Sequence, residues 1–305
     1  MTTFKIGTRA SPLALAQAHL VRDGLTHRHP YLLGHIEIVP MTTSGDTIQD
    51  RSLIELGGKS LFTKEIEEAL LKEDVDIAVH SLKDMPFELP EDLTIGAVME
   101  REDVRDVVIT SNGKFLKDLE PGSKVGTSSL RRQAQILHRY PHFEAVPIRG
   151  NVGTRLQKIE EGYADATLLA LAGLNRLSLA HLATEILSAE DMIPAVGQGA
   201  IAIESRKGDR HTQKLLEALN HRETWLATLA ERAFMREIEG SCRTPLGAYA
   251  EVHGSELYIK GFIASPNGQI LMLHHEKGAV TRAQDLGKDL GIVLKKKAQE
   301  CNISY

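Results

Sequence analysis

The sequence predicts an α/β fold followed by a small α+β domain, and three observations support this prediction. The chain has 305 residues, which is enough for two or three domains of ordinary size. Strand and helix signals alternate as far as about residue 204, a pattern typical of parallel or mixed sheets covered by helices. From about residue 219 the pattern changes to a long helix, three successive strands and a last helix.

The composition is that of a soluble globular protein, with 42% apolar and 25% charged residues. The net charge of -5 and the single dense lysine run, at residues 295–297, argue against a nucleic-acid-binding protein. Two cysteines exclude a disulfide framework. The first residues lack the apolar core of a signal peptide, and no apolar run approaches the ~20 residues that span a membrane. We therefore expect a cytoplasmic protein without nucleic-acid or membrane partners.

The first α/β region begins with a strand and a strongly marked helix start. Short apolar runs predict strands at residues 4–7, 36–40, 76–80 and 94–99. Ser11 is expected to cap a helix that has Pro12 at its first position and ends at His29 and Pro30. The residues expected to form its buried stripe are Leu13, Ala16, Leu20 and Val21. A second helix is predicted over 62–73, with Ile66, Ala69 and Leu70 facing inward.

The second α/β region repeats this pattern. Strands are predicted at residues 104–110, 143–148, 166–171 and 200–204, and residues 124–126 lead into the first helix of this region. Helices are predicted over 128–140 and after Asn151, which suits the N-cap position. Sheets of this kind bind ligands beyond the carboxyl ends of their strands.

The C-terminal region is predicted to be a small α+β domain. Its expected elements are a helix over 222–238, strands at 248–252, 257–264 and 269–275, and an amphipathic helix over 281–300. Ser-Pro-Asn-Gly at 265–268 predicts the turn between the last two strands.

Nearer the N-terminus, residues 42–59 form a long, polar stretch that contains several glycines, and we expect it to be a mobile or ligand-binding loop.

Arginines are concentrated between residues 131 and 176 of this acidic chain, mostly beside Gly, Ser or Asn. They are Arg131, Arg132, Arg139, Arg149, Arg155 and Arg176. Arginine grips carboxylate or phosphate with two hydrogen bonds, and helix starts add free N–H groups. The pattern, together with Arg9 before the Ser11 cap, predicts a ligand with several negative groups.

Some of these arginines have a simpler explanation. Arg131 and Arg132 could be solvent-facing helix residues, and Arg176 could only interact with the dipole at a helix end. Arg101, Arg105 and Arg139 lack a Gly, Ser or Asn context and are expected at the surface.

A polar loop follows the predicted buried strand at residues 76–80 and contains Ser81, Lys83 and Asp84. At the mouth of a sheet, these groups and His80 can position an ammonium group or hold a proton. The alternative is a turn in which Lys83 and Asp84 form a weak surface ion pair. His80 by itself is more typical of a structural histidine than of a base.

Cys242 lies in a loop of small residues beside Arg243, which suits a reactive thiol or an attachment point. The alternative is an inert buried cysteine, which usually has apolar neighbours.

The sequence contains no Walker motif, dinucleotide-binding motif or nucleophile elbow. It contains no His-Glu-x-x-His or Cys-x-x-Cys either, so no metal site is predicted.

Seven segments, in order and spacing, resemble the porphobilinogen deaminase (hydroxymethylbilane synthase) family. They are residues 7–15, 57–62, 78–86, 126–132, 149–151, 194–199 and the loop around Cys242. The resemblance implies two α/β domains like those of periplasmic binding proteins, facing each other across a cleft, and a third domain with a three-stranded antiparallel sheet and the cysteine loop. The implied boundaries are 1–99 with 200–218, 100–199, and 219–305.

The resemblance also implies an activity. Such enzymes condense four porphobilinogen molecules head to tail onto a dipyrromethane primer held through a thioether, here to Cys242, and release hydroxymethylbilane for tetrapyrrole and haem synthesis. Each pyrrole carries an acetate and a propionate, which suits a cleft rich in arginine. Asp84 is implied as the catalytic group: it assists loss of ammonia, stabilises the cationic methylene-pyrrolenine and accepts or relays a proton.

Further site residues follow from the resemblance. Those implied to hold the primer are Ser81, Lys83, Asp84, Ser129, Arg131 and Arg132. Those implied to bind the substrate or growing chain are Arg9, Ser11, Arg149, Arg155, Arg176 and, on the predicted loop, Lys59. A monomer without metal is expected. Ser60 and Ser241 replace glycines common in the family, which leaves the two loop conformations open.

Two other functions are compatible with parts of the sequence. A solute-binding protein for a polycarboxylate would use the arginines but would have no need of Asp84 or Cys242. A transferase with a cysteine nucleophile would need a base near Cys242, and the neighbouring residues offer none. Replacing Asp84 with asparagine distinguishes these functions from the implied one.

Overall fold

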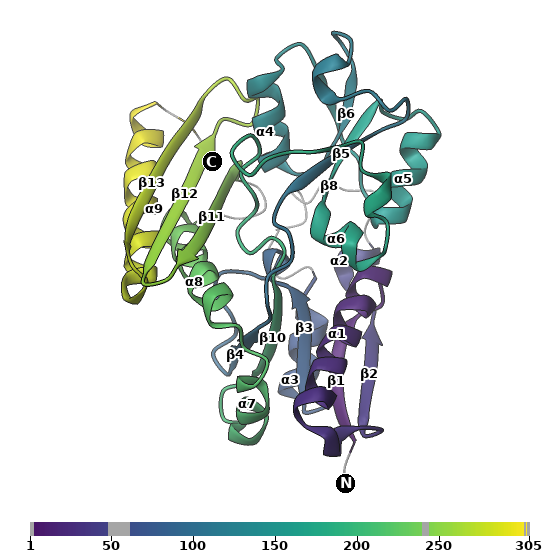
Figure 1. The fold of residues 1–305 in the computed structure, drawn as a ribbon, viewed down its shortest axis with the longest axis vertical. Coiled ribbons are helices and arrows are strands. Elements are labelled where there is room, and N and C mark those ends of the chain that lie inside the picture. Colours follow the sequence, from purple (N-terminus) through teal and green to yellow (C-terminus); the bar gives the residue numbers. More distant parts are fainter. Residues whose placement is uncertain (1–2, 48–61, 240–243, 302, 304–305) are drawn as a thin grey trace.

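The computed structural model describes residues 3–47, 62–239, 244–301 and 303 (Figure 1). The strands are β1 (Phe4–Arg9), β2 (Ile36–Met41), β3 (Ile77–Ser81), β4 (Leu93–Val98), β5 (Asp106–Thr110), β6 (Lys124–Gly126), β7 (Glu144–Val146), β8 (Ala166–Ala170), β9 (Glu185–Ile186), β10 (Ile201–Arg206), β11 (Leu246–His253), β12 (Glu256–Ala264) and β13 (Leu271–Ala279). The α-helices are α1 (Pro12–Arg28), α2 (Ser44–Thr47), α3 (Lys64–Leu71), α4 (Leu130–Arg139), α5 (Val152–Glu160), α6 (Leu171–Arg176), α7 (Arg210–Glu217), α8 (Arg222–Ile238) and α9 (Ala283–Glu300). Short 3₁₀ helices include η2 (Leu82–Asp84) and η3 (Leu116–Asp118).

The strands form two five-stranded mixed sheets with matching patterns. The first has the order β2-β1-β3-β10-β4, with β1 parallel to β2 and β3 and with β10 antiparallel to β3 and β4. The second has the order β7-β6-β8-β5-β9, with β6 parallel to β7 and β8 and with β5 antiparallel to β8 and β9. The chain therefore leaves the first sheet after β4 and rejoins it at β10, and the two sheets form separate lobes (Figure 1).

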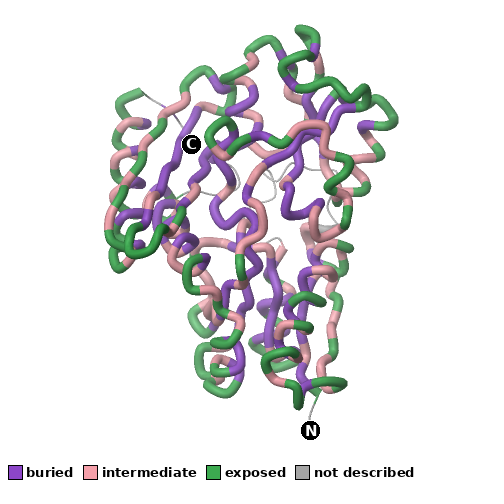
Figure 2. The backbone as a smooth tube through the Cα atoms, viewed as in Figure 1, coloured by how far each residue is buried: buried purple, intermediate pink, exposed green. Residues whose placement is uncertain are grey.

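The third sheet, β11-β12-β13, is antiparallel and packs against α8 and α9. The two helices approach closely at Gly287, where a Cβ would lie 1.9 Å from the Ala230 carbonyl oxygen, so only glycine fits there. Buried positions lie mainly on the inner strands of the sheets, whereas edge strands such as β2 and β13 have none and the outer faces of the helices are exposed (Figure 2). The predicted fold class, two α/β sheets with a C-terminal three-stranded antiparallel sheet, is confirmed.

Helix α1 begins as predicted, but it buries a different stripe. The Ser11 Oγ accepts a hydrogen bond from the Ala14 N–H, and Pro12 occupies the first turn. The buried residues are Ala14, Gln17, Ala18, Val21 and Leu25. The prediction was therefore wrong for Leu20, which is 44% exposed, because the sheet contacts the helix face that includes position 18. Leu13 and Ala16 are only half-buried.

Arg101 was predicted at the surface, and this prediction was wrong. Its guanidinium makes a two-point ion pair with Glu231, with contacts of 2.6 and 3.1 Å. Glu231 is fully buried and also accepts hydrogen bonds from the N–H groups of Gly197 and Ala250. The pair therefore joins the segment that leaves the first sheet, the segment that returns to it, and the third sheet. Arg105 and Arg139 lie at the surface as expected.

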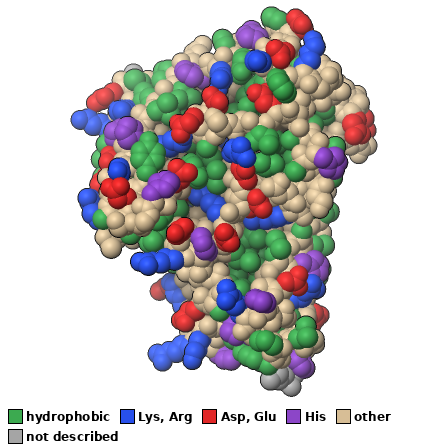
Figure 3. Space-filling model, in the orientation of Figure 1, with side chains coloured by type: hydrophobic (Ala, Val, Ile, Leu, Met, Phe, Trp, Pro, Cys, Tyr) green, Lys and Arg blue, Asp and Glu red, His purple; other side chains and the backbone are tan. Residues whose placement is uncertain are grey.

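No helix in the described part of the chain is long and apolar enough to cross a membrane. Acidic and basic side chains are interspersed over the face seen in Figure 3, without a broad region of one sign.

Candidate active site

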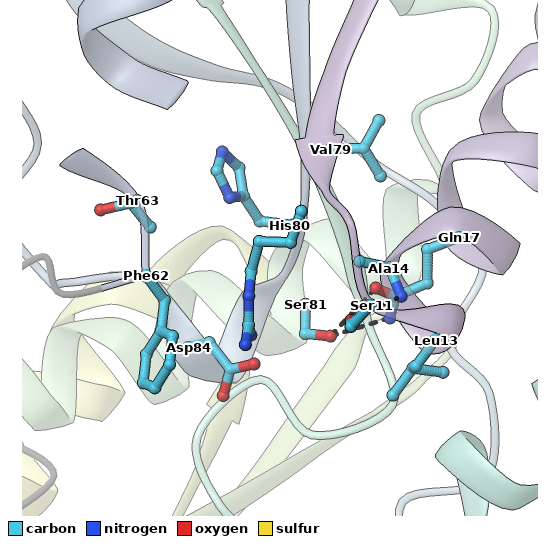
Figure 4. A pocket seen from close by; sticks show the side chains of 11 residues that line it. Ser11, Leu13, Ala14, Gln17, Phe62, Thr63, Val79, His80, Ser81 and Asp84 are labelled. Atoms are coloured by element: carbon cyan, nitrogen blue, oxygen red, sulfur yellow. Dashed lines mark hydrogen bonds between the residues drawn. The ribbon is translucent and has the colours of Figure 1, made fainter. Parts of the chain in front are cut away.

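Four of the predicted site residues meet at one edge of the first sheet. Arg9 is the last residue of β1, Ser81 is the last of β3, and these strands run parallel, so both lie at the carboxyl edge. Asp84 closes η2, directly after β3, and Ser11 caps α1. All four line one pocket, whose other residues include Phe62, Thr63 and His80 (Figure 4). The guanidinium of Arg9 lies 4.4 Å from the centre of the Phe62 ring, a cation–π contact.

Asp84 is exposed, but the residues on either side of it hold its backbone in place. Leu82 and Met85 are buried, at 2% and 3% exposure. The Leu82 N–H donates to the Ala200 carbonyl at 3.0 Å. Gly197 has a φ of +73°, and a Cβ there would lie 2.7 Å from the Leu82 Cγ, so only glycine allows this packing. A carboxylate is thus presented to solvent from a tightly packed turn.

A second pocket adjoins the first and is lined by Ser81, Lys83 and Arg176. Gln17 lines both pockets, and its Nε2 donates to the Ser81 Oγ at 2.8 Å. Arg176, at the end of α6, donates from Nη2 to the carbonyl of Gly199 at 2.7 Å. Gly199 lies just before β10, where the chain returns to the first sheet. Burial lowers the pKa of Arg176, against the opposing effect of Glu102. Arg176 therefore does more than interact with the dipole at the end of α6, because it also binds the backbone that leads into β10.

Arg131 and Arg132 share a single buried carboxylate, Asp106 of β5. The Nη2 atoms of both arginines lie 2.7 Å from oxygens of Asp106, and the two arginines are 5% and 6% exposed. They also donate to backbone carbonyls, Arg131 to Ile193 at 2.7 Å and Arg132 to Leu168 at 2.8 Å. The solvent-facing alternative is thus excluded. Although burial alone would raise the pKa of Asp106, the two arginines lower it to about 2.

We predict that replacing Asp106 with asparagine destabilises the protein by about 3–5 kcal/mol, because it leaves two buried guanidiniums without a counter-ion. The free energy of unfolding in urea measures this. The control is Asp103→Asn, whose ion pair with the half-exposed Arg105 should contribute less than about 1 kcal/mol. Equal losses in both variants would contradict the prediction. Since Asp106 has a lowered pKa, its stabilisation is present above about pH 4 and is lost as the pH falls towards 2.

Lys83, Arg131, Arg132, Arg149 and Arg155 form what we call the basic cluster. Burial lowers the pKa of Lys83 to about 8; Arg131 and Arg132 also lower it, whereas Asp84 and Asp106 raise it. Burial likewise lowers the pKa of Arg155 to about 10, with further lowering from Arg132 and Arg149 and an opposing effect of Asp84. Asp84 therefore acts on Lys83, its neighbour in the chain, and on Arg155 of the second lobe. Arg131 and Arg132 bind the other carboxylate, Asp106.

The helix starts in the second lobe are capped by side chains, by Asn151 as predicted and by Ser129, which was predicted inside the helix rather than as its cap. The Ser129 Oγ accepts from the Arg132 N–H at 3.5 Å, and the Asn151 Oδ1 accepts from the Thr154 N–H at 2.9 Å. Arg155, one turn into α5, donates from Nε to the Gly150 carbonyl at 2.9 Å. Arg149 lies just before this helix and is half-buried.

Lys59 and Cys242 lie outside the described residues. Residues 240–243, which include Cys242, lie between α8 and β11 in the sequence, and Glu239, the last described residue before them, has the left-handed φ of 58° that often ends a helix.

Three polar residues near the site, Gln17, Asp106 and Gln198, were not predicted from the sequence. Gln198 Nε2 donates to the Val104 carbonyl at 2.7 Å and to Asp106 at 3.1 Å. Asp106 could have been noticed as an acid that opens an otherwise apolar strand, and Gln17 as a glutamine among the alanines of α1. His80 is buried and its Nε2 lies 3.1 Å from Glu204, a structural pairing.

Comparison with known proteins identifies the family. Residues 4–214 match "Porphobilinogen deaminase, dipyromethane cofactor binding domain", and residues 225–296 match "Porphobilinogen deaminase, C-terminal domain". A porphobilinogen deaminase of Nitrobacter winogradskyi is 51% identical over 97% of this chain and 93% of that protein. One of Alkaliphilus metalliredigens is 47% identical over 96% and 92%.

A periplasmic binding protein of Salmonella typhimurium is a much more distant match among solved structures. It is 16% identical, covers 72% of this chain and 92% of its own, and has a TM-score of 0.40, too low to bear on function. The two family matches and the relatives at about half identity span nearly the whole chain, and they show that it belongs to the porphobilinogen deaminase family.

Proposed function

We propose that this protein condenses four porphobilinogen molecules head to tail, with loss of ammonia, and releases hydroxymethylbilane for tetrapyrrole and haem synthesis. Membership of the family makes it an enzyme and a transferase. The observation that carries the proposal for this chain is the position of Asp84: an exposed carboxylate on a packed turn, beside a surplus of buried and half-buried cations. Such a site can transfer protons next to a substrate that bears carboxylates.

The donor set fits the dipyrromethane cofactor of the family. Its two rings carry an acetate and a propionate each, and the basic cluster supplies more positive charge than Asp84 and Asp106 balance. Lys83 makes no ion pair among the described residues, which leaves its ammonium available to a carboxylate. Attached to Cys242, the cofactor supplies the nucleophilic carbon to which the substrate is added. We propose that Ser81, Lys83, Asp84, Ser129, Arg131 and Arg132 hold it.

Asp84 acts at the reacting atoms. Its carboxylate binds the aminomethyl group of the substrate as an ammonium and assists its departure as ammonia. The carbon–nitrogen bond breaks with its electrons on nitrogen, and Asp84 then stabilises the cation that remains on the methylene-pyrrole. When the new carbon–carbon bond forms, an oxygen of Asp84 accepts the proton released from the ring carbon. Asp84 finally returns this proton to solvent or ammonia.

The remaining cations bind the side chains of the substrate and the growing product. We propose this role for Arg9, Arg149, Arg155, Arg176 and Lys59, together with the neutral hydroxyl of Ser11. Arg131 and Arg132 are already paired with Asp106, so they hold the cofactor carboxylates mainly through their positive field.

The intact mass of the denatured protein tests the proposal directly. A mass above that of the polypeptide by two porphobilinogen units, each less ammonia, is expected. If the preparation has the bare mass, incubation with porphobilinogen should add the increment. A protein that never gains it would instead be a binding protein for polycarboxylates.

We predict that the cofactor-free protein loads its cofactor about tenfold more slowly at pH 9.5 than at pH 7, because Lys83, which has no cofactor carboxylate beside it before loading, loses its charge at about pH 8 rather than near 10.5. The rate falls as the pH rises because only the cationic form of Lys83 binds carboxylates, and its lowered pKa brings the loss of this charge into the tested pH range. Lys83→Arg keeps the charge throughout this range. The profile of this variant should therefore be flat above pH 8, and a fall equal to that of the wild type would assign the effect to another group.

We further propose that the domains comprise residues 1–99 with 200–218, 100–199, and 219–305, and that the protein is a cytoplasmic monomer. The place of β10 between β3 and β4 supports a return near residue 200. Light scattering should give a molar mass near 33.6 kDa.

A further inference from the structure

Helix α8 of the third domain binds the segment that follows Asp84. Arg232 donates from Nη2 to the carbonyls of Pro86 and Phe87, at 2.8 and 3.1 Å. Arg236, one turn further along, donates a longer bond of 3.3 Å to Phe87 from an exposed side chain. These bonds join residues that are 145 or more positions apart in the sequence, so the third domain fixes a turn that belongs to the first.

Apolar contacts hold the other side of the same turn. Met85 is buried in a cluster with Leu82, and Trp225 of α8 packs against that cluster. The backbone from 82 to 87 is thus held by α8 through Trp225 at one end and Arg232 at the other. Asp84 lies between the two anchors, and its side chain is the exposed one.

Arg232 is charged while it makes these bonds. Burial lowers its pKa to about 10, assisted by Arg236 and opposed by Glu204, which leaves it protonated at neutral pH. A charged donor binds a carbonyl more strongly than a neutral one. Its Nη1 is buried and has no hydrogen-bond partner within the described residues, and an unpaired donor opposes stability. The two bonds therefore contribute less to folding than their number suggests.

We propose that Arg232 is a positioning residue for the condensation reaction: it holds the carbonyls of Pro86 and Phe87 so that Asp84 keeps its catalytic position. This inference rests on the proposed role of Asp84. The third domain then sets the geometry of a catalytic group on the first domain. A shift of about 1 Å in such a group is enough to lower a rate strongly.

The test compares Arg232→Gln with Arg236→Gln in the protein that carries its cofactor. Active molecules are counted by intact mass, and kcat and KM are measured per active molecule. Arg232→Gln should lower kcat about tenfold with KM within twofold, and Arg232→Lys, which keeps a charged donor, should recover part of the loss. Arg236→Gln should stay within twofold of wild type. An unchanged kcat per active molecule in Arg232→Gln, or an equal loss in Arg236→Gln, would overturn the proposal.

A double variant separates this proposal from the function on which it rests. If Arg232 acts through Asp84, Arg232→Gln should cause no further loss of kcat in an Asp84→Asn background. A further tenfold loss there would show that Arg232 acts independently and would refute the positioning role. Full turnover of Asp84→Asn alone would instead refute the proposed function itself.

Discussion

Replacing Asp84 with asparagine should lower kcat by about 10²- to 10⁴-fold while the fold and the attached cofactor are retained. Asparagine has nearly the same shape but can neither accept the proton released during condensation nor carry the negative charge that stabilises a cation. Because Asp84 is exposed and its turn is held by Leu82, Met85 and α8, the change should cost little stability. Steady-state rates, intact mass and the urea midpoint together measure these effects.

A matched control exists in the second lobe. Leu-Lys-Asp occurs twice, in η2 (Leu82–Asp84) and in η3 (Leu116–Asp118), each time as one turn of 3₁₀ helix with a buried leucine. Asp118 is exposed like Asp84 but lines neither pocket. Asp118→Asn should therefore leave kcat within twofold of wild type. Turnover of Asp84→Asn at the wild-type rate would leave a binding protein as the better description.

Replacing Cys242 with serine should abolish the covalent cofactor and, with it, measurable product formation. A serine hydroxyl is a far weaker nucleophile than a thiolate, so no thioether can form and no stable substitute is expected. The intact mass of the variant should equal that of the bare polypeptide, before and after incubation with porphobilinogen. Anion binding to the basic cluster should persist, since none of its five residues is changed.

The second cysteine provides the control for this experiment. Cys301 is exposed, at the end of α9, and Cys301→Ser should carry the full mass increment and turn over normally. A Cys242→Ser protein that still carried the increment would show that another residue is the attachment point.

Local signals predicted the elements that hold the site. Ser11, followed by Pro12, and Asn151 are helix caps in the structure as predicted, and α8 has the predicted bounds of 222 and 238. Such signals succeed because a cap is a hydrogen bond between residues three apart. The same reasoning failed for α7, which was not predicted, and for the buried stripe of α1, because packing against the sheet chooses which face is buried.

The partners of the charged residues could not be predicted in this way. Arg101 was placed at the surface because nothing near it in the sequence suggested a partner, yet Glu231 lies 130 residues away. Arg131 and Arg132 were expected to bind ligand anions directly, and the structure gives both of them a protein carboxylate, Asp106. Their roles towards a cofactor remain predictions, as do those of Lys59 and Cys242.

The sequence by itself determined the α/β character, the helix starts and, through seven family motifs, the expected chemistry at Asp84 and Cys242. Only the tertiary structure decided that Asp106 sits between two arginines and that α8 holds the turn of Asp84. The return of β10 to the first sheet was implied by the family resemblance alone, since the local pattern had grouped residues 200–204 with the second region. The physical reason is range: caps and periodicity act over a few residues of one segment. Ion pairs and buried hydrogen bonds join segments that approach each other only when the sheets are assembled and water is excluded.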